Sequence, residues 1–147
     1  MRWFLIGLMA LLLSAGVPVL ADDIADLRAR ANQGDARAQN NLGVMYREGE
    51  GVGQDYQQAL FLFRKAADQG DANAQDNLGY MYDKGEGVGQ DDQQAHFWTR
   101  KAADQGYANA QTNLGIMYHK GQGVAQDDQQ AAFWYRKAAD QGYANAQ

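Results

Sequence analysis

The stretch Ala38-Gln39-Asn40-Asn41-Leu42-Gly43-Val44-Met45-Tyr46 decides the fold, because it returns twice at a fixed spacing. It recurs as residues 74–82 and again as residues 110–118, which gives a period of 36 residues. When 38–73, 74–109 and 110–145 are superposed, 25 positions are identical and 11 vary. A period of this length is typical of helical-repeat arrays, so the sequence predicts three full repeats, each made of a helix pair.

One apolar stripe marks the first helix of each repeat. In the first repeat its members recur at helical spacing, and they are Ala38, Leu42, Met45 and Tyr46. The glycine-rich segment 49–53 cannot continue this helix and predicts a connection. It recurs as 85–89 and nearly as 121–125 with no strand before it, which indicates a structural loop and not a phosphate-binding loop.

The second helix of each repeat has its own start and stop signals. Asp55 with Gln58 three residues later is a capping-box pattern, and Gly70 predicts the helix end. The same start and stop return at Asp91 and Gly106, then at Asp127 and Gly142. The predicted apolar face consists of Ala59, Phe63 and Ala66, extended by Phe61 and Leu62.

A glycine lies inside each first helix, where it costs about 1 kcal/mol relative to alanine. A helix keeps such a residue when a partner helix passes close by. We therefore expect small residues to face each other in three pairs: Gly43 with Ala59, Gly79 with Ala95, and Gly115 with Ala131.

The two ends of the chain differ from the repeats. Residues 1–21 are typical of a cleaved signal peptide: Arg2 precedes an apolar run, and Ala21 fits cleavage before Asp22. That run is too short for a membrane anchor, since spanning takes about 20 apolar residues. We therefore expect an exported protein, periplasmic or secreted, that does not span a membrane after signal removal.

Residues 22–37 predict a polar N-terminal capping helix, equivalent to half a repeat. Residues 146–147 would begin a truncated fourth repeat. We expect the last helix to expose Phe133 and Ala138, which a fourth repeat would cover, and to permit self-association through this uncapped helix.

The repeat resembles the Sel1-like repeat, a relative of the tetratricopeptide repeat. The matching residues of the second repeat are Ala74…Leu78-Gly79…Tyr82…Gly85…Gly87-Val88…Asp91…Ala95…Trp98…Lys101-Ala102-Ala103…Gln105-Gly106. Two departures stand where the family has Trp-Tyr: Leu62-Phe63 and Trp98-Thr99. The resemblance implies an all-α, right-handed α/α solenoid with a scaffold or adaptor role, and bacterial relatives of this kind are often exported envelope proteins that bind other proteins.

Composition excludes several classes of function. The net charge of −5, without clustered Lys or Arg, argues against nucleic-acid binding. Ser14 is the only serine and there is no cysteine, so serine- and cysteine-dependent acyl transfer is excluded once the signal is removed. The β-lactam activity of cysteine-rich Sel1-like relatives should therefore not be transferred to this chain. His96 and His119 lie in different repeats and predict no zinc site, while Asp91-Asp92 indicates helix capping.

Two hypotheses of function remain, and neither assigns a catalytic residue, metal or cofactor. The first is a non-catalytic interaction module that binds a partner protein or peptide in the concave groove of the array, and the expected partner is a cell-envelope protein. The second is an envelope protein that binds or hydrolyses glycan such as peptidoglycan. Hydrolysis would need two carboxylates in one cleft, for which Asp76 and Asp83 are the candidates. We favour the interaction module.

Three of the varying positions form a second stripe on the first helix, distinct from the apolar one, at spacing i, i+4 and i+7. In the tetratricopeptide array that this chain resembles, the first helices line the concave side. The predicted partner-binding residues are Asn40, Val44, Arg47, Asp76, Tyr80, Asp83, Thr112, Ile116 and His119. Tyr80 is the expected anchor, because aromatic residues dominate binding hot spots. The alternative is that these positions are solvated and have drifted after a duplication.

Overall fold

The computed structural model describes residues 21–145, and the side chains of residues 23–142. Apart from Ala21, the predicted signal peptide lies outside the described residues, as do residues 146–147. The described chain forms seven α-helices and no strand, which confirms the all-α prediction. The helices are α1 (Ala21–Asn32), α2 (Ala36–Glu48), α3 (Tyr56–Asp68), α4 (Ala72–Lys84), α5 (Asp92–Asp104), α6 (Ala108–Lys120) and α7 (Asp128–Asn145).

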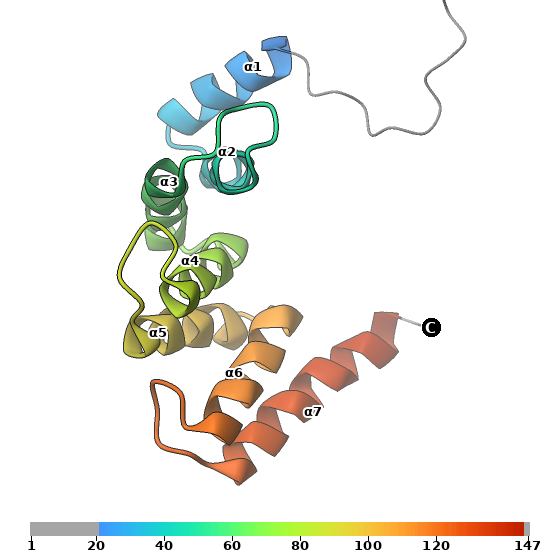
Figure 1. Ribbon diagram of the computed structural model, residues 1–147. Coiled ribbons are helices and arrows are strands. Elements are labelled where there is room, and N and C mark those ends of the chain that lie inside the picture. Colours follow the sequence, from blue (N-terminus) through green and yellow to red (C-terminus); the bar gives the residue numbers. More distant parts are fainter. Residues whose placement is uncertain (1–20, 146–147) are drawn as a thin grey trace, which may run out of the picture.

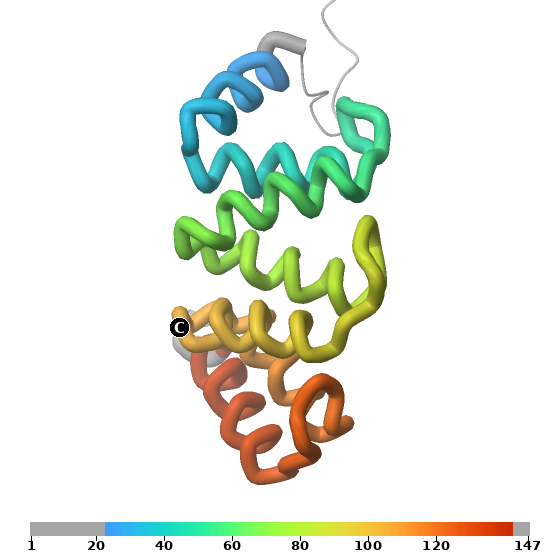
Figure 2. Tube along the Cα trace, turned by 90° about the vertical axis from the view of Figure 1, so that its left-hand side faces the viewer, coloured from blue at the N-terminus to red at the C-terminus, as the bar shows by residue number. Residues whose placement is uncertain are grey.

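The helices stack in chain order, each one packed against the next. Figure 2 shows this stack from the blue N-terminal helix to the red C-terminal one. The closest pairs are α2 with α3, α4 with α5, and α6 with α7, as expected for three helix-pair repeats. The stack bends, with α2, α4 and α6 toward the inside of the bend and α3 and α5 toward the outside (Figure 1). No described helix is both long and apolar enough to cross a bilayer.

Aspartates begin the second helices as predicted, but only half of each capping box forms. The Asp55 carboxylate accepts hydrogen bonds from the backbone N–H groups of Gln57 and Gln58, each at 3.0 Å. The backbone N–H of Asp55 does not bind the Gln58 side chain, because it donates instead to the Tyr46 carbonyl at 2.8 Å. This bond ties the end of the loop back to α2, and equivalent bonds recur in the other two repeats.

The predicted stop at Gly142 is wrong. Gly70 and Gly106 adopt positive φ angles of 94° and 90° just after α3 and α5. In contrast, α7 continues through Gly142 to Asn145. After α3 and α5 the chain must turn so that the next helix can pack back against the array. At Gly142 the described chain makes no such turn, and the helix runs on for three more residues.

The interior confirms most of the predicted apolar positions, with one correction. Phe63, Leu78, Met81 and Leu114 are the largest fully buried side chains. Phe61 does not extend the buried face, because it is 55% exposed on the outer side of α3. Its equivalents Phe97 and Phe133 are similarly exposed, and in each case a lysine one turn later lies about 5 Å from the ring (4.8, 4.9 and 5.0 Å).

This pattern also corrects the reason given for the exposure of Phe133. The exposure of this phenylalanine is a property of the outer face of the second helix in each repeat, and it does not result from an uncovered end. The third repeat differs from the first at two other positions of its second helix. Tyr135 and Ala138 are more exposed than their buried equivalents Phe63 and Ala66. Self-association through α7 stays a prediction.

The expected pairing of small residues holds only in part. At Gly79, an added Cβ would lie 3.2 Å from the Ala95 carbonyl oxygen, which confirms close backbone approach there. At Gly43, the nearest atoms belong to the Phe63 ring, at 2.8 Å, and not to Ala59. Gly43 therefore makes room for the ring of Phe63, which lies one turn after Ala59 on the second helix.

Buried glutamines join successive helices in a regular series, which we call the glutamine ladder. Gln39, Gln75 and Gln111 are buried on the first helices. The side-chain amide of Gln39 donates to the Ala31 carbonyl of α1 at 3.0 Å, and its oxygen accepts from Gln69, just after α3, at 2.8 Å. The same two bonds recur around Gln75 and Gln111. Each rung therefore connects three consecutive helices.

Candidate binding groove

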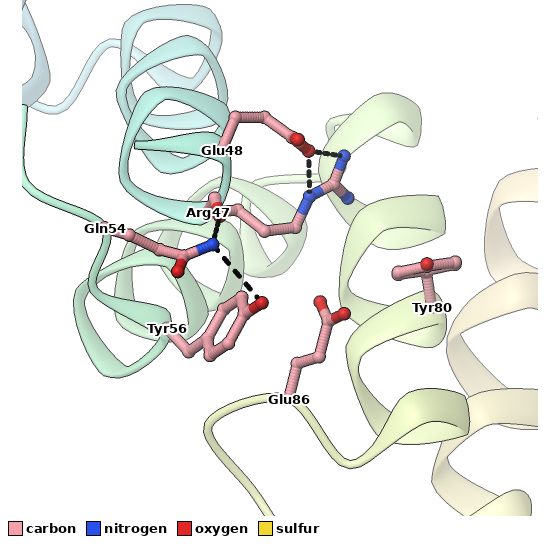
Figure 3. A pocket seen from close by; sticks show the side chains of 6 residues that line it. All are labelled: Arg47, Glu48, Gln54, Tyr56, Tyr80 and Glu86. Atoms are coloured by element: carbon pink, nitrogen blue, oxygen red, sulfur yellow. Dashed lines mark hydrogen bonds and ion pairs between the residues drawn. The ribbon is translucent and has the colours of Figure 1, made fainter. Parts of the chain in front are cut away.

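The inner side of the bend carries two pockets, one in each junction between repeats. The small pocket has a volume of about 130 Å³ and lies between the end of α2 and α4 (Figure 3). Its lining residues are Arg47, Glu48, Gln54, Tyr56, Tyr80 and Glu86. The large pocket, of about 550 Å³, lies between the α4–α5 pair and α6. Its lining residues are Gly79, Tyr80, Asp83, Lys84, Gln90, Ala95, Thr99, Asn113, Ile116, Met117, Lys120 and Gln122.

Tyr80 lines both pockets, so it is the residue that connects them. Its side chain is 43% exposed, which leaves much of the ring open to a ligand. The guanidinium of Arg47 lies 5.3 Å from the ring centroid and the Lys84 ammonium lies 5.8 Å from it. Cations at these distances are attracted to an aromatic face and help to hold the ring in place.

Two ion pairs between adjacent residues lie along the groove, and the order of their signs along the chain is reversed between the two pockets. In the small pocket, Arg47 forms an ion pair with Glu48 at 2.7 Å. In the large pocket, Asp83 pairs with Lys84 at 2.8 Å, and the hydrogen bond to Asp83 raises the pKa of Lys84. Gln122 also donates a hydrogen bond to Asp83 from across the pocket. Each pair is neutral as a unit, so the remaining lining charges are Glu86 in the small pocket and Lys120 in the large one.

The floor of the small pocket contains an unsatisfied acceptor. One carboxylate oxygen of Glu86 is buried and has no hydrogen-bond partner. Nearby, the Gln54 amide donates to the Arg47 carbonyl at 2.8 Å and to the Tyr56 hydroxyl at 3.3 Å, as Figure 3 shows. A buried oxygen without a partner is unfavourable, so a ligand that donates a hydrogen bond would be stabilised at Glu86.

Of the nine predicted partner-binding residues, four line the pockets: Arg47, Tyr80, Asp83 and Ile116. Asn40 does not face the groove, because it is only 8% exposed and accepts a hydrogen bond from Asn77 of α4 at 3.0 Å. Val44 packs against the core cluster. Thr112 is exposed, and its hydroxyl donates to the Ala108 carbonyl of its own helix at 3.2 Å. His119 is exposed and lies 2.9 Å from the Asp128 carboxylate.

Asp76, the remaining predicted residue, is not a solvated acid. Burial raises the pKa of its carboxyl group, while a 3.5 Å hydrogen bond from Asn113 and the charge of Arg47 act in the opposite direction. A raised pKa is one property of a general acid, but the proposed second carboxylate, Asp83, is already engaged by Lys84 and Gln122. The two groups do not form the free pair that glycoside hydrolysis requires.

The stripe prediction missed several helical positions that line the pockets and also missed the contribution of the loops. Glu48, Lys84 and Lys120 occupy the same place in successive repeats and line the pockets. This position also varies in the sequence, so the same signal would have found it. Gln54 and Gln90 were missed because they are identical in all repeats, and sequence variation cannot identify an identical residue.

The two histidines lie in different surroundings, His119 being exposed. His96 is partly buried, its ring meets Tyr118 edge-on at 5.5 Å, and burial together with the charge of Arg100 lowers its pKa. Within the part of the chain that the structure describes, no three His, Asp or Glu side chains gather as metal ligands would.

Comparisons with known proteins agree with this architecture. The family model described as the Sel1 repeat matches residues 36–71, 72–107 and 108–143. A solved Sel1 repeat protein from Oxalobacter formigenes is 42% identical, with a TM-score of 0.74, over 82% of this chain and 90% of that one. Comparison with curated proteins gave no significant match.

Two further solved structures are similar. A protective antigen of uropathogenic Escherichia coli strains, described as displaying an SLR fold, is 44% identical with a TM-score of 0.80. The match covers 82% of this chain but only 26% of the antigen. Cysteine rich protein B of Helicobacter pylori has a TM-score of 0.63 over 80% of this chain and 89% of that one, and at 23% identity it supports the fold alone.

Proposed function

The chain belongs to the Sel1 repeat family, whose members are generally non-catalytic protein-interaction scaffolds, and from this we propose that it is an exported interaction module. It binds a partner protein or peptide along the inner side of the array, across the small and large pockets. The partner is a component of the cell envelope or of the surroundings of the cell.

The observation that carries this proposal is the position of Tyr80. An aromatic side chain that is partly exposed, held between two cations and open to a pocket on each side has the properties of a binding anchor. The pockets next to it supply both a free acceptor, at Glu86, and paired charges, at Arg47 and Asp83. A peptide that lies along the groove would contact all of these groups in order.

Export is proposed from the N-terminal sequence. Arg2, the apolar run that follows it and Ala21 have the order of a signal peptide. Detection of the mature protein in the periplasm or medium, with Asp22 as its first residue by N-terminal sequencing, would support this. Retention of the full-length chain in the cytoplasm would contradict it.

Groove variants test the binding proposal. Tyr80→Ala, and the triple variant that adds Arg47→Ala and Asp83→Ala, should lose capture of the envelope partner that the unmodified protein enriches. Each variant should keep the helical circular dichroism of the parent. Phe61→Ala is the matched control, because it removes an aromatic ring that is also exposed (55%, against 43% for Tyr80) from the outer side and should leave capture unchanged.

The opposite result is equally informative. If the triple variant binds the identified partner with full affinity, the groove is not the binding site. If Phe61→Ala weakens binding instead, the partner binds the outer face of the second helices.

A further inference from the structure

One loop position lines both pockets, and it carries an acid in the small pocket and an amide in the large one. The acid is Glu86, and the third repeat has Gln122 in the same place. The Gln122 amide donates hydrogen bonds to Asp83 and, at 3.3 Å, to Asp92. The polar group of the large pocket is therefore satisfied within the chain, whereas a buried carboxylate oxygen of Glu86 has no hydrogen-bond partner.

The groups that could satisfy Glu86 from within the small pocket are engaged elsewhere. Arg47 and Tyr56 occupy the positions that match the two aspartates bonded to the amide in the large pocket. The Arg47 guanidinium pairs with Glu48 at 2.7 Å, and the Tyr56 hydroxyl accepts a hydrogen bond from Gln54 at 3.3 Å. Among residues 21–145, Glu86 forms no ion pair.

The small pocket is negative as a result. Its charged lining residues are one cation and two carboxylates, which gives a net charge of −1. Lys84 lies outside this lining and belongs to Asp83: its pKa is raised first by the hydrogen bond to Asp83 and least by the charge of Glu86. The unbalanced charge and the unpartnered oxygen therefore belong to the same carboxylate.

Aromatic rings flank this carboxylate. Figure 3 shows the Glu86 side chain between those of Tyr56 and Tyr80, and all three line the pocket. Two cations already lie near the Tyr80 ring, but no described cation lies over the ring of Tyr56, which is 36% exposed. A ligand cation is attracted both to a carboxylate and to an aromatic face.

The loop holds the acid in place before any ligand binds. The backbone N–H of Glu86 donates to the Met81 carbonyl at 3.0 Å, which ties the loop to the end of α4. The next residue, Gly87, has a φ of 71°, and a Cβ added to it would lie 2.7 Å from the carbonyl oxygen of Tyr56. The loop is therefore packed directly against the start of α3, and little order has to be gained on binding.

We infer that the small pocket binds a primary ammonium group of the partner, supplied by a lysine side chain. The ammonium donates a hydrogen bond to the free oxygen of Glu86, and its charge lies against the Tyr56 ring. A guanidinium suits the site less well, because its planar fork matches two carboxylate oxygens and only one oxygen of Glu86 is buried without a partner. The volume of about 130 Å³ is below the roughly 300 Å³ at which small-molecule sites begin, and it fits the end of one side chain. This inference rests on the proposed function, since it assumes a protein or peptide ligand in the groove.

Small ammonium ions test the pocket without the partner. n-Butylammonium reproduces the lysine side chain, glycinamide reproduces a peptide N-terminus, and tetramethylammonium carries the charge without an N–H group. Each is titrated into the full chain at neutral pH and low ionic strength while amide NMR shifts are recorded. We expect saturable shifts at Tyr56, Tyr80 and Glu86, with n-butylammonium the tightest of the three. Tetramethylammonium should bind about tenfold more weakly, because it cannot donate to the carboxylate.

One substitution and its matched control decide the role of Glu86. Glu86→Gln removes the charge but introduces the residue that the third repeat carries at this position, so the fold should be retained. It should weaken n-butylammonium by about tenfold or more, and it should weaken partner capture as well. Glu50→Gln makes the same change at the equivalent position of the first repeat, which is exposed and lines neither pocket, and should leave the affinity unchanged. Both variants lose one negative charge, so a difference between them does not come from the net charge of the protein.

Three results would overturn the inference: no saturable shift around the pocket, equal affinity for n-butylammonium in Glu86→Gln and Glu50→Gln, or tighter binding of glycinamide, which would replace the lysine by a terminal amine. Partner capture separates this failure from failure of the proposed function. If Tyr80→Ala abolishes capture while Glu86→Gln retains it in full, the groove is the binding site but the small pocket takes no ammonium group. If Tyr80→Ala captures the partner fully, the proposed function itself fails, whatever the probes do.

Discussion

Replacement of Leu78 by alanine tests the central packing of the array. Leu78 is fully buried in the cluster that also contains Phe63 and Met81. The change removes three carbon atoms, which at about 0.8 kcal/mol for each buried methylene gives a transfer cost of about 2.4 kcal/mol. A residual cavity adds to this cost, and measured losses for buried leucines run from about 2 to 5 kcal/mol.

We expect a loss of about 3–5 kcal/mol, above the transfer cost alone, because the neighbours of Leu78 have little freedom to fill the cavity. Phe63 and Met81 are themselves fully buried, Phe63 on the preceding helix α3 and Met81 on α4, the helix of Leu78 itself. The assay is urea unfolding followed by circular dichroism and by tryptophan fluorescence. Both probes are needed, because repeat arrays do not always unfold in one step. Trp98 lies in the same cluster and reports on it directly.

Phe61→Ala is the matched control for this measurement. It removes more carbon atoms than the leucine change, but from a side chain that is 55% exposed. If burial determines the cost, Phe61→Ala is the milder variant. A loss below about 0.5 kcal/mol for Leu78→Ala, which is the range of surface substitutions, would refute the packing argument. A larger loss for Phe61→Ala would refute it as well.

Three other outcomes are expected. Gly79→Ala should destabilise the protein despite the better helix propensity of alanine, because its Cβ would meet the Thr99 hydroxyl at 2.6 Å and α5 backbone at 3.2 Å; the free energy of urea unfolding measures this. Asp76→Asn should stabilise the protein at pH 7, since burial raises the pKa of Asp76 and so disfavours its charged form. That gain should disappear as the pH falls below 3.8, where the carboxyl group is protonated in both states; urea titrations at several pH values measure it. Self-association through α7 should increase with concentration in light scattering and decrease in Tyr135→Glu.

Each of these has a control or a contradicting result. Gly53→Ala serves as the control for Gly79, because no atom lies within 4 Å of its added Cβ and its φ is not positive. A gain for Asp76→Asn that persists unchanged into acid would show that packing, and not charge, is responsible. A monomeric parent at high concentration would remove the case for association through α7.

The repeat period was enough to predict the helix pairs, their starts at Asp55 and Asp91, and the burial of Leu78. These features depend on local spacing and on a pattern that three copies make unambiguous. The sequence could not show that Asn40 is buried, because its partner Asn77 lies one repeat away and the contact depends on how the helices stack. Nor could it show that α7 passes Gly142, since that outcome depends on what packs against the helix afterwards.

The binding surface was predicted less well for the same reason. Arg47, Tyr80 and Asp83 vary between repeats and line the pockets, as the stripe implied. Thr99 also varies, but in the sequence it was only a departure from a family pattern. Its close contact with Gly79 depends on how α4 and α5 pack, which is visible only when the three repeats are compared as packed structures.

The glutamine ladder has a consequence for how such a protein can grow. Each rung uses a neutral amide that donates to the helix before it and accepts from the residue after the next helix. Each repeat therefore supplies the groups that bond to the repeat before it and the groups that bond to the repeat after it. A duplicated copy can join its parent without a compensating change elsewhere. Because amides do not titrate, none of the hydrogen bonds in that junction depends on the protonation of its side chains. Array length and groove chemistry can then evolve separately: copies add length through the ladder, while positions such as 80 and 99 diversify inside the pockets.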